Sequence, residues 1–321
     1  MAFYDVCNGD ADGLFALRQL RLASPVESIL VTGIKRDIGL LERVRAGDGD
    51  HVTVLDIAVG PNRLALERLL DAGASVTWYD HHAPGPTPLP SHARLRAHID
   101  TSAQTCTSLL VDEKLKGRFR AWAVAAAYGD NLPRAAERLA VLLGLTKEQR
   151  AQLQMLGEAV NYNAYGESEA DVRIHPAALY RWIVRYTSPF DLLAQSPIVQ
   201  ELDELRRSDL ARARTATARL QDDQCSVVML PDAPWSRRVL GTFANELATT
   251  DPRRAHAVLR EQADGSYMVS LRAPITSPHG ADAIARQFGG GGRASAAGID
   301  HLDMLDVPRL IAALTAAEWQ R

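Results

Sequence analysis

The 321-residue sequence predicts an α/β protein: a doubly wound parallel sheet, then a helical connector and a smaller α/β domain. Three observations support this prediction. Short apolar runs alternate with helical patterns over the first hundred residues. Several of these runs stop at or just before aspartate or histidine. A second alternating set begins near residue 224, after a long charged tract. We therefore expect a first domain at residues 1–190, a connector at 191–223 and a second domain at 224–321.

The N-terminal elements follow one another in regular order. Apolar runs predict strands at residues 2–6, 27–32, 51–55, 75–79 and 95–99. Helical patterns lie between them at residues 14–22, 38–45 and 61–72. Residues 101–108 then open a helix, and their hydroxyl groups would either cap it or hold a phosphate. Residues 118–160 are helical, with a break at 128–133.

Acidic and imidazole side chains follow the predicted strand ends. They are Asp10 and Asp12 after the first strand, Asp56 after the third, and Asp80, His81 and His82 after the fourth. The carboxyl ends of parallel strands share one edge of a sheet, so these side chains should converge. Carboxylates that meet repel one another unless a cation neutralises them, which predicts a divalent-cation site. Each motif alone also has a simpler interpretation, in which the aspartates cap turns or helices and the histidines are solvated.

Asp130 stands at the break in the helical region. It follows an apolar helical run and precedes Pro133, which can begin the next helix. Asp130 is therefore either a helix cap or a further metal ligand. Residues 156–166 mix amides with tyrosines, and they would either face a nucleobase or form a polar helix end.

The C-terminal part begins after a charged tract at residues 199–220, which predicts an exposed connector helix. Strands are expected at residues 225–230, 254–260 and 266–272, with helices at 237–249 and 305–319. Four consecutive glycines let a backbone approach a ligand closely, and the small residues after them are expected to begin a helix. The predicted phosphate-binding residues are Arg272, Gly290, Gly291, Gly292, Arg293 and Ser295.

Composition narrows the class of protein. The net charge is −3, which argues against a broad basic surface for long nucleic acid. The sequence contains no apolar run of about 18 residues and its start does not resemble a signal peptide, so we expect neither a membrane span nor secretion. Three widely spaced cysteines fit a reducing compartment. We therefore expect a cytoplasmic protein that binds a short anionic ligand.

The motifs, in this order, resemble those of the DHH phosphoesterase family with its DHH-associated C-terminal domain. The resemblance covers nearly the whole chain. It rests on Asp10-x-Asp12-Gly13, Asp56, Asp80-His81-His82, Asp130, Ser270-Leu271-Arg272 and the glycine-rich loop at 290–298. Residues 128–133 are also similar to the fourth motif of RecJ-type nucleases.

The resemblance implies two Mn²⁺ or Mg²⁺ ions. Asp12, Asp56, His81 and Asp130 would hold one ion, and Asp10 with a bridging Asp56 would hold the other. The family pattern also implies that Asp80 orients His81 and that His82 contacts the scissile phosphate. Two such ions would clamp a phosphodiester and activate a bridging hydroxide for in-line attack.

Three positions depart from the family pattern. Val6 stands where many members have histidine, and Asn8 stands where RecJ-type members often have aspartate. The first metal site is therefore expected to be poorer, completed by another ligand or water, or weakly occupied. Arg293 stands where many members have histidine, and arginine still suits a phosphate.

The expected substrate is a short oligoribonucleotide, especially a dinucleotide, cleaved to 5′-mononucleotides. A two-domain cleft, an acidic isoelectric point and no recognisable extra nucleic-acid module favour it over a long single strand. The alternatives are a RecJ-like exonuclease, a cyclic-dinucleotide or phosphoadenosine-phosphate phosphatase, and a nucleotide sensor with a decayed metal site. A homodimer is compatible with the sequence.

Overall fold

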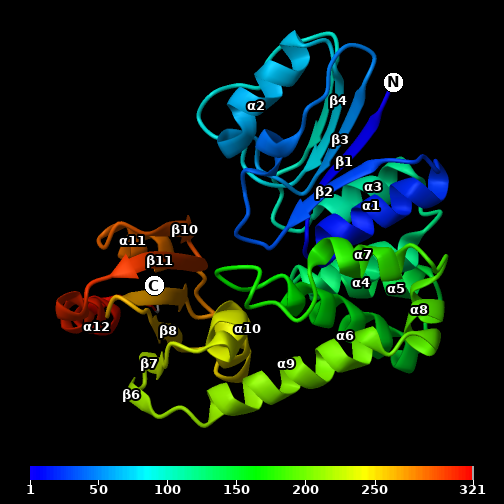
Figure 1. Ribbon diagram of the computed structural model, residues 1–321. Coiled ribbons are helices and arrows are strands. Elements are labelled where there is room, and N and C mark those ends of the chain that lie inside the picture. Colours follow the sequence, from blue (N-terminus) through cyan, green and yellow to red (C-terminus); the bar gives the residue numbers. More distant parts are fainter. Residues whose placement is uncertain (320–321) are drawn as a thin grey trace. The chain divides into compact units, whose positions relative to one another are not determined.

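The computed structural model describes residues 1–319 and divides into two compact units, Met1–Glu204 and the chain from Leu205 onward. Each unit has its own sheet and hydrophobic core (Figure 1). Within residues 1–319, every helix is too short or too polar to cross a membrane. The domain limits expected at residues 190 and 223 stay predictions.

The N-terminal unit is built on a five-stranded, wholly parallel sheet. Its strands are β1 (Phe3–Asn8), β2 (Ile29–Gly33), β3 (His51–Leu55), β4 (Ser75–Asp80) and β5 (Leu95–Ile99). The spatial order is β2-β1-β3-β4-β5, which confirms the predicted doubly wound sheet. Because the order reverses at β1, the ends of β1 and β3 flank the switch point where such sheets bind ligands.

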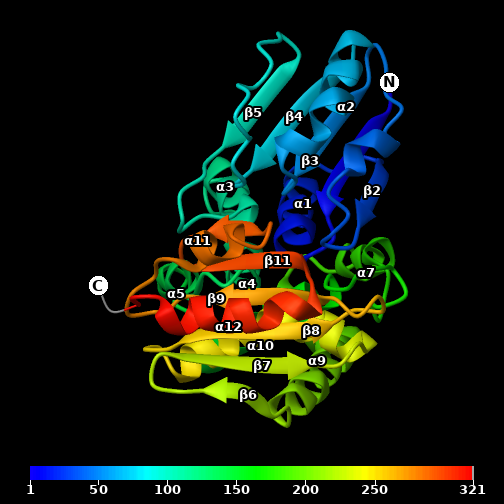
Figure 2. The same cartoon turned by 90° about the vertical axis from the view of Figure 1, so that its left-hand side faces the viewer.

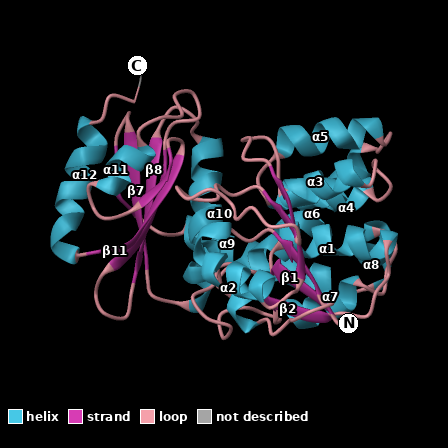
Figure 3. Cartoon of the chain, turned by 90° about the horizontal axis from the view of Figure 1, so that it is seen from above, coloured by secondary structure: helices cyan, strands magenta, loops and turns pink. Residues whose placement is uncertain are grey.

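Both faces of this sheet are covered by helices (Figure 3). Successive side chains of a strand point to opposite faces. Val6 of β1 therefore joins a core with Leu66 of α2 (Val59–Asp71), whereas Cys7 joins the opposite core with Leu14 of α1 (Ala11–Ala23). Consecutive residues at the end of β1 are therefore apolar on both faces of the sheet.

Six more helices complete the main body of this unit. They are α3 (Thr107–Lys114), α4 (Arg120–Gly129), α5 (Pro133–Leu142), α6 (Lys147–Asn163), α7 (Pro176–Ile183) and α8 (Pro189–Gln195). The predicted break at 128–133 is confirmed, since Pro133 begins α5. The helices α4 and α6 cross very closely: a Cβ at Gly157 would lie 1.9 Å from the carbonyl oxygen of Ala125.

Two helix predictions need correction. The pattern at residues 38–45 gives only a 3₁₀ turn, η1 (Leu40–Arg43), and the amide of Leu41 in this turn donates to Asn62 Oδ1. The connector helix α9 (Ile198–Arg214) is shorter than expected, and it is not wholly exposed because Leu202 and Leu210 are buried. Beyond it, β6 (Ala218–Gln221) pairs with the next sheet.

The C-terminal unit has a six-stranded mixed sheet in the order β10-β11-β9-β8-β7-β6. Its further strands are β7 (Cys225–Leu230), β8 (Ala255–Glu261), β9 (Tyr267–Arg272), β10 (Gly291–Arg293) and β11 (Ala296–Leu302). Among the described strands of this second sheet, β7 and β8 pair in parallel and the other pairings are antiparallel. In Figure 2, α12 (Val307–Ala316) crosses the front of this sheet and α10 (Pro234–Thr250) lies behind it.

The glycine-rich segment does not begin a helix as expected. It forms the tight hairpin of β10 and β11, and a short helix α11 (Ala281–Arg286) precedes it. Gly292 has φ of 144°, and a Cβ there would lie 2.6 Å from the carbonyl oxygen of Ala296. The small residues after the glycines are therefore explained by strand pairing with β9 and by the narrow hairpin.

Candidate metal centre

The carboxyl edge of the parallel sheet gathers the acids and imidazoles that follow its strands. Ligand atoms of Asp12, His81 and Asp130 lie within 4.8 Å of one another, and so do those of Asp56, His81 and His82. His81 belongs to both groups. The structure thus brings together side chains from the ends of β1, β3, β4 and α4.

Asp10 caps the first helix of the chain. Its Oδ1 accepts the amides of Asp12 and Gly13, each at 3.1 Å. Gly13 is required at this turn, because a Cβ there would lie 2.2 Å from the carbonyl oxygen of Asn8. The capping interpretation is therefore correct for Asp10, which is nevertheless part of the same acidic edge.

Asp12 caps a different helix. Its two carboxylate oxygens accept the amides of Thr107 and Ser108, each at 2.7 Å, at the start of α3. The prediction that hydroxyl groups cap this helix is wrong: Ser108 Oγ donates to the backbone oxygen of Asp12, and Thr107 Oγ1 donates to Asp56 Oδ1 at 3.3 Å. The helix α3 therefore fixes the orientation of both Asp12 and Asp56.

Asp56 occupies an unusual backbone conformation, with φ of 58°. Its amide still donates to the carbonyl oxygen of Tyr79, so the turn occurs immediately after the β3–β4 pairing. Burial and repulsion from Asp10 and Asp12 raise the pKa of Asp56 well above its ordinary value. A positive charge beside this carboxyl would stabilise its ionised form.

Asp80, the last residue of β4, and the two histidines after it point in two directions, because residues two apart lie on the same side of an extended chain. Asp80 Oδ1 hydrogen-bonds His82 Nδ1 at 2.7 Å. The resemblance implied that Asp80 orients His81, and the structure corrects this pairing. Burial alone would lower the pKa of His82, but Asp80 raises it above the ordinary value. His82 is 41% exposed and lies at the rim of the site.

His81 joins Asp56 to the group formed by Asp12 and Asp130. His81 is 8% exposed, and its Nε2 lies 3.4 Å from Asp56 Oδ1 and 3.9 Å from Asp130 Oδ2. Burial raises the pKa of Asp130 to about 6. With Asp12, these residues present three carboxylates and one imidazole, a donor set that suits Mn²⁺ or Mg²⁺.

Lys35 is a member of the site that the sequence analysis missed. It lies two residues beyond the end of β2, and its Nζ contacts Asp10 Oδ2 at 2.6 Å. Its amide donates to the carbonyl oxygen of Ala164, and its Nζ lies 5.3 Å from the ring centroid of Tyr165. Burial would lower the pKa of Lys35, but attraction to Asp10 and its neighbours raises it well above its usual value.

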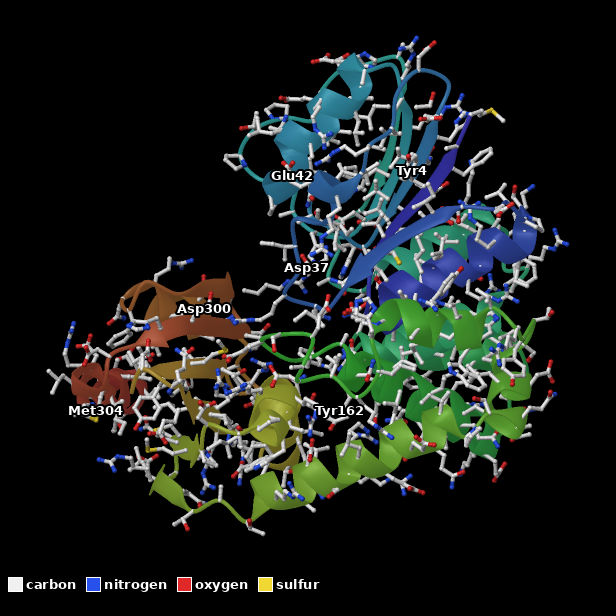
Figure 4. All side chains as sticks on the ribbon, in the orientation of Figure 1. Tyr4, Asp37, Glu42, Tyr162, Asp300 and Met304 are labelled. Carbon is white, nitrogen blue, oxygen red and sulfur yellow. The ribbon has the colours of Figure 1, made fainter. Side chains whose placement is uncertain are left out.

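The sequence signal for Lys35 was its position after a strand that ends on the same edge. Lys35 was missed because the prediction of metal ligands considered only acidic and imidazole side chains. Figure 4 shows Asp37, from the same loop, beyond the carboxyl end of the sheet, whereas Tyr4 near the start of β1 lies toward the other end.

The predicted phosphate-binding residues belong to the C-terminal unit. Arg293, Ala296 and Arg272 form one row across β10, β11 and β9, so their side chains point to the same face. Arg272 donates to Asn245 Oδ1 at 2.6 Å and to the carbonyl oxygen of Gly241 at 3.3 Å, which fastens β9 to α10. Gly291, Gly292, Arg293 and Ser295 are exposed, and Gly290 is half-buried.

Comparison with known proteins gives a family for one unit and a fold for the whole chain. Residues 222–318 match the DHHA1 domain family. No curated protein sequence matches the chain significantly. Three similar solved structures are informative.

RecJ from Thermus thermophilus in complex with Mn²⁺ has a TM-score of 0.61 at 20% identity over 98% of this chain, which spans 51% of the RecJ chain. The pGpG-specific phosphodiesterase PggH from Vibrio cholerae has a TM-score of 0.60 at 17% identity, with 97% of both chains covered. A manganese-bound exonuclease RecJ has a TM-score of 0.62 at 16% identity, with 98% of this chain and 89% of that chain covered.

Both RecJ structures contain manganese. The likeness in fold covers the two units and the connector. Residues 222–318 therefore match the DHHA1 domain family, and the chain as a whole shares the fold of RecJ and of the phosphodiesterase PggH.

Proposed function

We propose that this protein is a metal-dependent phosphodiesterase that hydrolyses short oligoribonucleotides, above all dinucleotides, to 5′-mononucleotides. The observation that carries the proposal is the convergence on His81 of Asp12 and Asp130 from one side and Asp56 from another, at the switch point of the sheet. Asp12, Asp56 and His81 are buried, and Asp130 is half-buried. A purely structural role would not require that many unneutralised carboxylates around one imidazole.

Each side chain has a distinct task in this proposal. A divalent cation held by these four residues would act as a Lewis acid on the phosphate and lower the pKa of an attacking water. The amides of α3 keep Asp12 in place, and Thr107 orients Asp56. His82, held by Asp80 at the rim, donates a hydrogen bond to a phosphate oxygen and steadies the leaving oxygen.

Two observations support a short substrate. The net charge of −3 does not favour a long polyanion. PggH, which is described as specific for the dinucleotide pGpG, shares the fold over 97% of both chains. In this proposal, the row of Arg272 and Arg293 on the second unit offers two positive charges to an anionic ligand.

The test is Mn²⁺-dependent hydrolysis of 5′-phosphorylated RNAs from two to seven nucleotides, pGpG included. Cyclic dinucleotides and phosphoadenosine phosphate serve as parallel substrates. We expect cleavage of dinucleotides, and a loss of about 10²–10³-fold in kcat for Asp56→Asn. Equal cleavage of all lengths would instead indicate a RecJ-type exonuclease. Tight nucleotide binding without hydrolysis of any substrate would indicate a sensor.

A further inference from the structure

The Lys35–Asp10 pair lies where the family pattern implies the second metal ion. That pattern assigns this ion to Asp10 and the bridging Asp56. In this chain, Asp10 Oδ1 accepts two backbone amides at 3.1 Å, and its Oδ2 contacts Lys35 Nζ at 2.6 Å. Both oxygens of Asp10 therefore already have partners.

The other positions that would complete such a site offer no ligand. Val6 is fully buried in the core on the α2 side of the sheet. Asn8 has its side-chain oxygen turned back to accept the amide of Asp10 at 3.2 Å. Around Asp10, the donor set that remains is too small for a second divalent cation, which needs several oxygen or nitrogen ligands. The other group of candidate ligands, Asp56 with His81 and His82, shares His81 with the group of Asp12 and Asp130 and does not include Asp10.

Lys35 is held in position from three sides. Its backbone amide donates to the carbonyl oxygen of Ala164 at 2.9 Å, beyond the end of α6. Its Nζ lies over the ring of Tyr165 and contacts Asp10, and its side chain is 29% exposed. The ammonium group of Lys35 is thus a fixed positive charge at the acidic edge. It neutralises the carboxylate of Asp10 and, unlike a metal ion, needs no set of coordinating ligands.

We propose that Lys35 replaces the second divalent cation, so that the site uses one exchangeable ion and one built-in ammonium group. This inference rests on the proposed function, because it concerns the same site. It makes Lys35 a positioning residue: it neutralises Asp10 and keeps the acidic edge able to accept an anionic phosphate. Val6 and Asn8 then differ from the family pattern because a lysine takes the place of the second cation, and they do not indicate a site that has lost its activity.

The experiment measures metal stoichiometry. The full-length protein, stripped of metal and titrated with Mn²⁺, is followed by isothermal titration calorimetry and by electron paramagnetic resonance in frozen solution. We expect one Mn²⁺ per chain with the spectrum of an isolated ion. Two ions per chain with spin coupling would overturn the inference and leave the hydrolase intact. No bound ion would instead refute the proposed function.

Variants test whether Lys35 is responsible. Lys35→Ala releases Asp10 and should bind a second, weaker ion at millimolar Mn²⁺, and its kcat at low Mn²⁺ should fall about 100-fold and recover partly as Mn²⁺ rises. Lys147→Ala removes the same charge from the exposed start of α6 and should keep a stoichiometry of one. If Lys35→Ala still binds a single ion at millimolar Mn²⁺, Lys35 does not occupy a cation's place. The wild-type spectrum decides between one ion and two even if a variant does not fold.

Discussion

The carboxylate of Asp12 has two roles, one in capping a helix and one in the candidate metal centre. Its oxygens accept the first amides of α3, and they also face His81 and Asp130 in the candidate metal centre. The residue is 1% exposed, so these amides cannot turn to water if it is removed. A single aspartate therefore links the folding of α3 to the chemistry of the site.

This double role predicts a difference between two aspartates of the same cluster. Asp12→Ala should lower the free energy of unfolding by about 2 kcal/mol in metal-free protein, because two buried amides lose their acceptor. Asp130→Ala removes the same charge, but its carboxylate is 19% exposed and lies 3.9 Å from the His81 nitrogen, so it should cost much less. Urea unfolding with a chelator present compares them. Equal losses would mean that Asp12 does not act as a cap.

At the residue scale, the sequence predicted which acids and imidazoles meet, because a strand end is visible as an apolar run that stops. It did not predict their hydrogen-bond partners. The pairing of Asp80 with His82 depends on the direction of each side chain after β4. The contact of Lys35 with Asp10 depends on the position of β2 beside β1, a neighbour relation that the order of motifs does not contain.

At the scale of secondary-structure elements, the helices α4 and α6 cross so closely that there is no room for a side chain at Gly157. Gly157→Ala would force its Cβ against the carbonyl oxygen of Ala125, and it should lower the free energy of unfolding by about 2–3 kcal/mol. Gly60→Ala in α2 is the matched control: its Cβ would meet only the carbonyl oxygen of Pro84 at 3.8 Å. That change should stabilise by roughly 0.5 kcal/mol, through helix propensity. Urea denaturation of both variants gives the comparison.

The strands β7 and β8 hold a histidine whose protonation should affect the C-terminal unit. His256 lies opposite Ser226; its Nε2 donates to the carbonyl oxygen of Asp251 at 3.0 Å, and its Nδ1 is 2.7 Å from Ser226 Oγ. Burial lowers the pKa of His256 below 6.5, although the Asp251 carbonyl opposes this shift. The unfolded chain then binds more protons, so the contribution to stability is full above about pH 6.5 and is lost as the pH falls.

We expect the wild-type melting temperature to fall more than that of His256→Gln between about pH 7.5 and pH 5.5. Calorimetry at the two pH values measures this difference. His301→Gln changes an imidazole of the same unit that is 65% exposed, and it should follow the wild type. An identical pH response in all three proteins would assign the pH dependence to other groups.

At the element scale, the sequence was most accurate where periodicity and burial agree. The strands β3, β5 and β7 have the predicted limits. It was wrong for the glycine-rich segment, because glycine permits both a helix start and a tight hairpin. Pairing of Ala296 with Arg272 on β9 decides between them, and that contact is distant in sequence.

The whole molecule consists of two units with separate cores, and this separation has a measurable consequence. All candidate metal ligands lie within Met1–Glu204. At about 100 times its dissociation constant, a bound ion stabilises the folded state by about 2.7 kcal/mol. In hydrogen exchange, Mn²⁺ should therefore slow exchange at the starts of α1 and α3 and leave β7 to β9 unchanged.

The control for this experiment is Asp56→Asn, which should abolish the protection by Mn²⁺. Equal protection in both units, or protection confined to the second, would place the ion elsewhere.

At the scale of the whole molecule, the sequence predicted two α/β units and a helical link, because a new pattern of hydrophobic residues begins near residue 224. It did not predict that β6 of the second sheet begins inside the tract read as connector.

The left-handed backbone at Asp56 also bears on how this protein can change in evolution. At φ of 58°, aspartate, asparagine and glycine are the residues that fit with least strain. In the genetic code, both alternatives are one base away from an aspartate codon. A screen of all substitutions at position 56 should therefore find that the most accessible inactive variants, Asp56→Asn and Asp56→Gly, are also the ones that keep the fold. A single point mutation would turn the proposed hydrolase into a stable protein able to bind a nucleotide without cleaving it.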